Sequence, residues 1–352
     1  MKGLVLSATL NTFYVLCEDN TVRLCNIKGK RIQSLSGTYN CLAAGDSVEI
    51  VPTDQGKGLV ETLYPRRNVF GRYNEKGKAE QAIAANVDLV FCVASASLPP
   101  FRPRFIDRVA VLAEYSSLPF VIILNKIDLG IADEVAARLD EYEKLGYRVF
   151  RISVKEGSGL EDVSNFIQGK LSVFAGQSGV GKSSLVNALF PGLKRRTQEV
   201  SVKYNRGKHT TTMAELLIRD DGAKIVDTPG VRRLALRSIP PSALSSCFPE
   251  ILAQEAFCKL GSKCTHTGED GCSVPDAVDI GEINLDRYES YLRIFAELAE
   301  AETWKRKQQG ALGRESVSRK EWVRRSGGKA FRQNSLSRNT LENLDGFSDY
   351  DE

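Results

Sequence analysis

The most informative segment of this sequence is Leu171-Ser172-Val173-Phe174-Ala175 followed by Gly176-Gln177-Ser178-Gly179-Val180-Gly181-Lys182-Ser183. An apolar run of this length indicates a buried strand, and the residues from Ser184 onward indicate a helix. A glycine-rich turn between a strand and a helix is the context that a phosphate-binding loop requires. Its amides and the helix N-terminus attract phosphate, Lys182 neutralises phosphate oxygens, and Ser183 is suited to ligate magnesium. The predicted phosphate-binding residues are Gly176, Gln177, Ser178, Gly179, Val180, Gly181, Lys182, Ser183 and Ser184.

A second motif, Asp227-Thr228-Pro229-Gly230, follows a short apolar strand about forty residues later. Alone it would be a common turn sequence. After a phosphate-binding loop, it matches the part of a nucleotide site where Asp227 holds magnesium through water and the Gly230 amide meets the γ-phosphate.

A third motif, Asn125-Lys126-Ile127-Asp128, ends the apolar strand 121–124. The Asp128 carboxylate can accept two hydrogen bonds from the ring and exocyclic nitrogens of guanine, and adenine cannot supply both donors. We expect Asn125 to fix the loop, the Lys126 stem to cover the base, and the Ser153 amide to meet the guanine oxygen. Because this loop occurs together with a phosphate-binding loop, we predict binding of GTP and GDP.

The order of these motifs indicates a circular permutation. Ordinary GTPases place the phosphate-binding loop before the base-reading motif, whereas here Asn125 precedes Gly176. The same site can still assemble because ligands bind at the carboxyl ends of the strands of an α/β sheet. Apolar strands alternate with helices from about residue 85, which predicts a parallel sheet covered by helices. The predicted strands are 88–93, 120–124, 147–152, 171–175, 214–218 and 223–226, and the predicted helices are 105–115, 133–144 and 160–168.

The segment Gly207-Lys208-His209-Thr210-Thr211-Thr212 lies where the first switch loop of a GTPase belongs. We expect Thr210 and Thr211 to contact GTP, and Thr211 to ligate magnesium together with Ser183 and Asp227. Val231 stands where many GTPases have a glutamine that orients water. A neutral His209, with an ordinary pKa of about 6.5, is our candidate for that role. The alternatives are that His209 contacts RNA or caps the loop, and that Lys208 or a group supplied by a bound partner acts instead.

Cys258, Cys264, His266 and Cys272 offer three thiolates and one imidazole within a short, glycine-containing stretch. Four such ligands fill a tetrahedral zinc shell and leave no position for water, so the predicted zinc ion is structural. The competing interpretation is a group of unrelated buried thiols.

The regions on either side of the nucleotide motifs indicate an RNA-binding protein. Short β-rich runs separated by turns predict a small antiparallel barrel before residue 65, although an unspecialised β-domain would give the same pattern. Near the C-terminus, a long helix is predicted from Leu285 to about Lys307, and we expect the residues from Gly310 onward to be largely mobile without a partner. The basic residues that crowd this end favour a polyanionic partner over a merely solvated tail. They are Lys305, Arg306, Lys307, Arg314, Arg319, Lys320, Arg324, Arg325, Lys329, Arg332 and Arg338.

No stretch of the sequence approaches the roughly 20 apolar residues of a membrane span, and the N-terminus lacks the layout of a signal peptide. We therefore expect a cytoplasmic protein with no membrane partner, whose eight cysteines are thiols or metal ligands.

The ordered motifs AANVD, FIDR, NKID, GQSGVGKSSL, GKHTTT, DTPGV, the cysteine–histidine cluster and RYESY resemble the ribosome small subunit-dependent GTPase family, RsgA. The resemblance covers nearly the whole chain. It implies a multidomain fold with an N-terminal OB-fold β-barrel at 1–66, a permuted α/β P-loop GTPase domain at 67–236, and a mainly α-helical zinc-binding domain at 237–309. A basic and then acidic tail follows at 310–352.

The resemblance also implies a function. The protein would bind the immature small ribosomal subunit and its rRNA as a monomer, and GTP hydrolysis, stimulated by the subunit, would time its release late in maturation. The catalytic histidine proposed for the family falls on His209. Two alternatives remain: a nucleotide-gated RNA-binding module with incidental turnover, and a GTPase that acts on tRNA or the large subunit.

Overall fold

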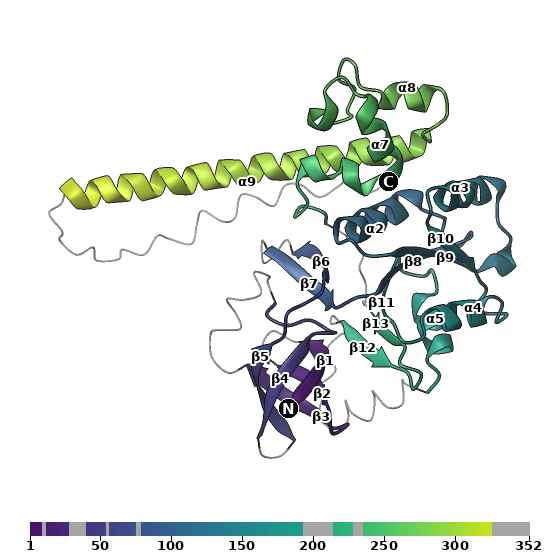
Figure 1. Ribbon diagram of the computed structural model, residues 1–352, viewed down its shortest axis with the longest axis vertical. Coiled ribbons are helices and arrows are strands. Elements are labelled where there is room, and N and C mark those ends of the chain that lie inside the picture. Colours follow the sequence, from purple (N-terminus) through teal and green to yellow (C-terminus); the bar gives the residue numbers. More distant parts are fainter. Residues whose placement is uncertain are drawn as a thin grey trace. The chain divides into compact units, whose positions relative to one another are not determined.

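The computed structural model describes residues 1–8, 12–27, 40–53, 56–74, 79–192, 214–227 and 235–325 of the chain. The chain divides into two compact units, Met1–Glu302 and Thr303–Glu352. The predicted barrel, the nucleotide-binding motifs and the cysteine–histidine cluster all belong to the first unit. Figure 1 colours the chain along its sequence.

The N-terminal residues form a five-stranded barrel, as predicted, but it is not wholly antiparallel because β3 and β5 pair in parallel. Its strands follow one another in the order β1-β2-β3-β5-β4, and pairing of β1 with β4 closes the ring. Alternate residues of these strands point inward, and the interior is filled by apolar side chains that include Val5, Phe13, Val15, Ile50 and Val60. The strands are β1 (Lys2–Ala8), β2 (Phe13–Cys17), β3 (Val22–Ile27), β4 (Ser47–Thr53) and β5 (Lys57–Leu63).

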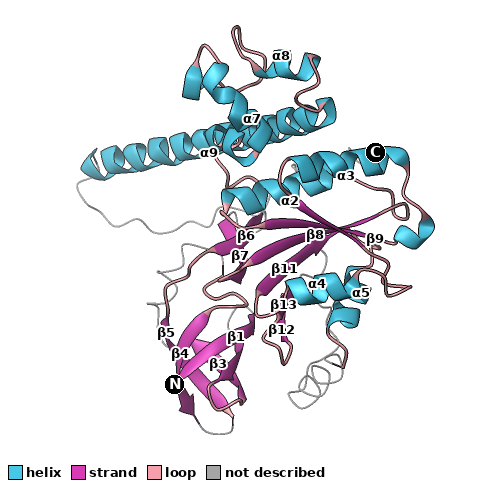
Figure 2. Ribbon diagram, turned by 45° about the vertical axis from the view of Figure 1, so that its right-hand side comes forward, coloured by secondary structure: helices cyan, strands magenta, loops and turns pink. Residues whose placement is uncertain are grey.

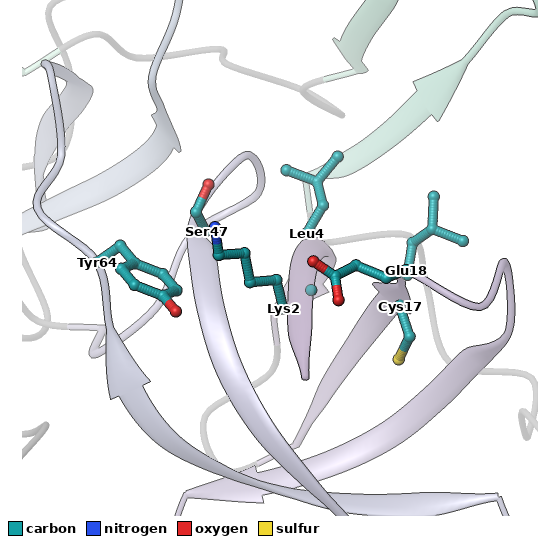
Figure 3. A pocket seen from close by; sticks show the side chains of 8 residues that line it. Lys2, Leu4, Cys17, Glu18, Ser47 and Tyr64 are labelled. Carbon is teal, nitrogen blue, oxygen red and sulfur yellow. The ribbon is translucent and has the colours of Figure 1, made fainter.

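A shallow groove crosses the barrel surface where β1, β2 and the start of β4 meet (Figure 3). The Lys2 ammonium lies 5.9 Å from the centre of the Tyr64 ring at one end of this groove. Glu18 lines it as well, so the groove carries charges of both signs.

A β-hairpin that the sequence pattern did not predict follows the barrel in the chain and precedes the first strand of the central sheet. It consists of β6 (Val69–Asn74) and β7 (Ala79–Ala85), which form a separate two-stranded sheet. The hairpin contacts the barrel region through Asn40, whose side chain donates to the Ala82 carbonyl at 2.8 Å and accepts from the Ala82 amide at 2.9 Å.

The central sheet confirms the predicted α/β region. Its parallel strands have the order β10-β9-β8-β11-β13, and β8, β9 and β11 are buried along their whole length, as expected for strands covered on both faces. One detail differs from the prediction: β12 runs antiparallel to β13. The two strands are joined by a turn of five residues, which is too short for a parallel crossover. The strands are β8 (Leu89–Ser95), β9 (Phe120–Asn125), β10 (Arg148–Arg151), β11 (Leu171–Gly176), β12 (Glu215–Ile218) and β13 (Lys224–Asp227).

Helices cover both faces of this sheet, and Figures 1 and 2 show α2 and α3 on one face and α4 and α5 on the other. Two hydrophobic clusters correspond to the two faces: Val109 and Leu139 belong to the first, and Val163 and Leu185 to the second. The helices are α2 (Pro103–Tyr115), α3 (Asp133–Lys144), α4 (Leu160–Phe166) and α5 (Lys182–Leu189), with a 3-10 turn at Ile127–Leu129.

The residues after the central sheet are mainly helical, as predicted, but the last helix is longer than expected. Helix α9 spans Leu285–Arg325, whereas the sequence predicted an end near Lys307. The stretch after Lys307 is rich in Arg, Lys, Glu, Gln and Ala, which favour helix and outweigh the roughly 1 kcal/mol cost of each glycine. The other helices are α7 (Pro249–Gln254) and α8 (Val274–Asp279), with 3-10 turns at Pro241–Ala243, Ser245–Cys247, Glu255–Phe257 and Gly261–Lys263. Among the described residues, none of the helices is both long and apolar enough to cross a membrane.

Candidate functional site

The predicted nucleotide motifs meet at one edge of the central sheet although they are scattered along the chain. Asn125 ends β9, Gly176 ends β11 and Asp227 ends β13, and all three strands point the same way. The register aligns Phe174 with Asp227 and Gly176 with Val93. Loops from three separate parts of the sequence therefore lie together at the carboxyl ends of the strands, which is where α/β folds bind ligands.

Asn125 joins the base-reading loop to the phosphate-binding loop. Its side chain is buried, donates to the Val180 carbonyl at 2.9 Å and accepts from the Val154 amide at 3.2 Å. Gly181 lies directly against it in the left-handed conformation, with φ +92°, and a Cβ at that position would collide with the Asn125 amide. The base-reading and phosphate-binding loops are therefore packed closely enough that one position requires glycine.

Lys126 forms a second link between these loops. Its backbone is left-handed, with φ +67°, and its ammonium donates to the Gly179 carbonyl at 2.8 Å. It also donates to the Leu98 carbonyl at 2.5 Å, in the connection between β8 and α2. Leu98 was not predicted as part of the site, because a backbone carbonyl leaves no signature in the sequence.

Asp128 is held in place by Ser153, whose hydroxyl donates to the Asp128 carboxylate at 2.7 Å. The Ser153 amide is directed elsewhere and donates to the Ser158 carbonyl at 3.0 Å. The structure therefore differs from the prediction that this amide is available to guanine. The Lys155 ammonium lies 3.8 Å from the other Asp128 oxygen and is largely exposed, so we expect that pair to contribute little.

Within the described part of the chain, the phosphate-binding side of the site includes an ion pair. The Lys182 ammonium lies 3.2 Å from an Asp227 carboxylate oxygen, and the lysine is nearly buried. Ser183 and Ser184, in the first turn of α5, are exposed. Exposed amides and hydroxyls at a helix N-terminus, next to a lysine and an aspartate, form an arrangement that can bind a phosphate group with a cation.

Part of the predicted site lies outside the described residues. This applies to His209, Thr210 and Thr211 of the first switch motif, and to Gly230 at the end of the second motif.

The four predicted metal ligands come together in one cluster. Their ligand atoms all lie within 4.8 Å of one another, and all four side chains are buried. The Nδ1 atom of His266 lies 3.5 Å from the Cys258 sulfur and 3.7 Å from the Cys272 sulfur, and these two sulfurs are 3.9 Å apart. Burial lowers the pKa of His266, which favours the neutral ring that binds metals. The cluster can therefore hold one metal ion.

The turn that carries these ligands is held by its neighbours. The Glu269 carboxylate accepts from the amides of Thr265 at 2.7 Å and Thr267 at 2.8 Å. Burial alone would raise the pKa of Glu269, but a hydrogen bond from the Thr265 hydroxyl, together with those from the amides, outweighs burial and the pKa falls to about 2. From α9, the Tyr288 hydroxyl donates to the His266 carbonyl at 3.0 Å and the Tyr291 hydroxyl donates to the Thr265 carbonyl at 2.6 Å.

Comparison with known proteins agrees with this arrangement. The family model for the RsgA GTPase matches residues 63–237. A small ribosomal subunit biogenesis GTPase RsgA from Thermotoga maritima is 39% identical over 301 residues, which cover 84% of this chain and 96% of that protein. The RsgA 2 protein of Bacteroides thetaiotaomicron is 36% identical over 305 residues, which cover 85% of this chain and 98% of that protein. This chain belongs to the RsgA GTPase family.

Solved structures support the assignment to the RsgA GTPase family. The crystal structure of YjeQ from Thermotoga maritima matches with a TM-score of 0.67 and 35% identity, covering 85% of this chain and 98% of that one. The structure of YloQ, described as a circularly permuted GTPase, matches with a TM-score of 0.63 and 29% identity, covering 85% and 95%. The permuted order of motifs inferred from the sequence thus agrees with the description of YloQ as a circularly permuted GTPase, and membership of the RsgA GTPase family supports GTP hydrolysis as the activity.

Proposed function

We propose that this chain is a GTP hydrolase that binds the small ribosomal subunit and hydrolyses GTP during its late maturation, with the nucleotide state controlling binding and release. The observation that carries the proposal is the meeting of Asn125, Asp128, Lys182 and Asp227 at one sheet edge. The names of the relatives, small ribosomal subunit biogenesis GTPases, supply the partner.

Guanine specificity rests on Asp128 in this proposal. With Ser153 donating to one carboxylate oxygen, Asp128 is oriented before nucleotide arrives and keeps lone pairs for the two guanine donors. A nucleotide with adenine would leave this buried carboxylate poorly paired, which is costly. Asn125 and Lys126 contribute by fixing the distance between the base-reading and phosphate-binding loops.

Phosphate and magnesium would be held by the loop at residues 176–184 and by Asp227. Hydroxyl and carboxylate oxygens are the ligands that magnesium prefers, so Ser183 and Asp227 fit that ion, with Thr211 as the proposed third protein contact. Bound magnesium would neutralise the charge that develops on the phosphates. Lys182, now paired with Asp227, is placed to exchange that partner for a phosphate oxygen. His209 remains our candidate for orienting the attacking water, with Thr210 and Gly230 as further nucleotide contacts.

We propose that the ion in the cysteine–histidine cluster is a structural zinc. For Zn–S distances of about 2.3 Å and Zn–N distances of about 2.0 Å, a tetrahedral site separates its sulfurs by about 3.8 Å and its sulfur from its nitrogen by about 3.5 Å. The distances of 3.9 Å between Cys258 and Cys272 and of 3.5 to 3.7 Å to His266 are close to these values. With Cys264 as the fourth ligand the shell is full.

Contact with rRNA is assigned in this proposal to the barrel and to the basic residues between Lys305 and Arg338. The three proposed domains are 1–66, 67–236 and 237–309, followed by the tail at 310–352. We further propose a monomeric protein that works in the cytoplasm, where small subunits mature.

The test is GTP turnover by the purified full-length chain, alone and with isolated small or large ribosomal subunits. The proposal predicts strong stimulation by small subunits only, and no turnover by an Asp227→Ala control that still melts like the wild type. Turnover that is unaffected by any particle would favour a nucleotide-gated binding module. Stimulation by tRNA or large subunits alone would favour a GTPase of those partners.

A further inference from the structure

A buried cluster of charged side chains lies between the GTPase helices and the metal module, by which we mean α7, the cysteine–histidine cluster, α8 and the first turns of α9. We call it the Asp107 cluster, and its members come from α2, α3, α9 and the start of α7. They are Asp107, Arg138, Tyr142, Glu250 and Arg287.

Asp107 is the centre of this cluster and is fully buried on α2. Its carboxylate accepts from the Arg287 guanidinium at 2.7 Å, from the Tyr142 hydroxyl at 2.6 Å and from the Arg138 guanidinium at 3.3 Å. Two elements, α9 and α3, are therefore fastened to one carboxylate of the GTPase fold.

Arg287 connects this carboxylate to the metal module. It is 2% exposed, donates two hydrogen bonds to Glu250 at 2.7 and 3.2 Å, and lies 4.6 Å from the centre of the Phe248 ring. Burial by itself would lower the pKa of Arg287, but Asp107 and Glu250 outweigh burial and raise it well above its ordinary value. The guanidinium therefore stays charged, and its rigid planar shape fixes both carboxylates at once.

The two ends of this connection reach the two functional sites. Past Arg287, Tyr288 and Tyr291 on α9 hydrogen-bond the turn that carries His266. In the other direction, α2 begins five residues after Leu98, whose carbonyl accepts from Lys126 beside the phosphate-binding loop. A continuous series of packed and hydrogen-bonded groups thus runs from the metal-ligating turn to the base-reading loop, without passing through the segment that follows Asp227.

We propose that Asp107 and Arg287 are positioning residues that couple the metal module to the guanine-nucleotide site through α2, so that binding of the small subunit to the basic residues farther along α9 changes nucleotide affinity and turnover. This inference rests on the proposed function. Coupling between two binding events is reciprocal, so the nucleotide must change the affinity for the subunit by the same factor.

The test measures that factor directly. The dissociation constant of the full-length protein for small subunits is determined with a non-hydrolysable GTP analogue and with GDP, and the ratio of the two constants gives the coupling.

The main variant, Asp107→Leu/Glu250→Leu/Arg287→Met, replaces the buried charges by apolar groups of similar size, a change that packed interiors often tolerate. Arg138 keeps Asp286, Glu141 and Asn284 as partners in this variant. The matched control is Arg293→Ala, an exposed arginine of α9 paired with Glu289 on the same helix.

We expect the triple variant to bind GDP in the absence of subunits within about twofold of the wild type, and the affinity ratio to fall at least tenfold. An unchanged ratio in a variant that binds GDP normally would overturn the coupling. A merely structural cluster would lower stability without changing this ratio.

A milder variant covers the case in which the triple variant does not fold. Tyr142→Phe removes only the hydroxyl, which contacts Asp107 and the Pro103 carbonyl, and we expect it to lower the ratio about threefold; a wild-type ratio would overturn the proposal. If small subunits change neither the GTP turnover nor the nucleotide affinity of the wild-type protein, the proposed function fails. If both variants keep the wild-type ratio of dissociation constants, only the role of the Asp107 cluster is refuted, and the proposed function stands.

Discussion

The substitution Gly181→Ala tests whether GDP binding depends on the close contact between the phosphate-binding loop and Asn125. Gly181 precedes α5 with φ +92°, and an added Cβ would collide with the side-chain amide of Asn125. That amide donates to Val180 at 2.9 Å, and the carbonyl oxygen of the same side chain accepts from Val154 at 3.2 Å. One methyl group therefore strains the phosphate-binding loop and disturbs the residue that joins it to the base-reading loop.

The expected magnitude follows from two terms. The left-handed conformation costs a residue with a Cβ about 1–2 kcal/mol. Displacing Asn125 forfeits one or two hydrogen bonds, each worth about 1 kcal/mol net. Without nucleotide the variant can relax by moving the loop, but nucleotide binding requires the original loop geometry. The free energy of nucleotide binding is therefore weakened by the cost of about 2–4 kcal/mol. At about 1.4 kcal/mol per factor of ten, GDP affinity should fall roughly 30- to 1000-fold.

The assay is titration with a fluorescent GDP analogue, together with thermal melting with and without GDP. Gly146→Ala is the matched control, because Gly146 has φ +89° but no heavy atom near the position of its Cβ. This control should lose about 1 kcal/mol or slightly more of stability and none of its GDP affinity.

A double-mutant cycle tests whether the loss of affinity comes from the collision between the new Cβ at position 181 and the Asn125 side chain. Asn125→Ala removes the group that the new methyl would strike, so Gly181→Ala should cost less in that background than in the wild type. Wild-type GDP affinity in Gly181→Ala, or full additivity of the two substitutions, would refute the reasoning.

Four further outcomes follow from the same geometry. Asp128→Asn replaces an acceptor of two guanine donors, so GDP affinity should fall about 10- to 100-fold while xanthosine diphosphate binds better, as competition titrations would report. Cys272→Ser should lose its metal by elemental analysis and lower the melting temperature, whereas Cys247→Ser, at a buried cysteine outside the cluster, should keep the metal. Because the pKa of Glu269 is lowered to about 2, its stabilisation is complete above its ordinary value of 4.5 and is lost only as the pH falls toward 2. The melting-temperature loss of Glu269→Gln should therefore be the same at pH 5 and pH 7, and a loss that vanishes at pH 5 would contradict this. His209→Ala should lower subunit-stimulated turnover and leave GTP affinity intact; unchanged turnover would exclude a catalytic role.

Features encoded in contiguous residues could be predicted from the sequence. Strands β8, β9 and β11 are continuous apolar runs, and β9 and β11 end in motifs whose chemistry identifies them, so the meeting of Asn125 with the phosphate-binding loop followed from topology. The four metal ligands lie within fifteen residues, and their residue types alone specify a metal site.

Contacts between distant residues could not be predicted. Asp107 and Arg287 are 180 positions apart, and each belongs to a helix in which a charged residue would ordinarily face solvent. Leu98 contributes a carbonyl, and Ser153 contributes its hydroxyl where its amide was expected. Hairpin strand β7 lacks the alternation of a half-buried strand, because four successive residues at its end are buried against neighbouring elements.

In this permuted chain, the two switch motifs are followed by residues that contact the N-terminal elements. The first switch motif lies in the segment before β12, and the first residue of that strand, Glu215, pairs with Ser7 of the barrel. The segment after Asp227 is followed by Ala235, whose carbonyl accepts from the Tyr73 amide of the hairpin at 3.2 Å. Both switch-motif segments are thus followed by residues that are hydrogen-bonded to N-terminal elements. The proposed RNA-binding barrel and the hairpin therefore contact the residues that directly follow the two segments expected to respond to the γ-phosphate.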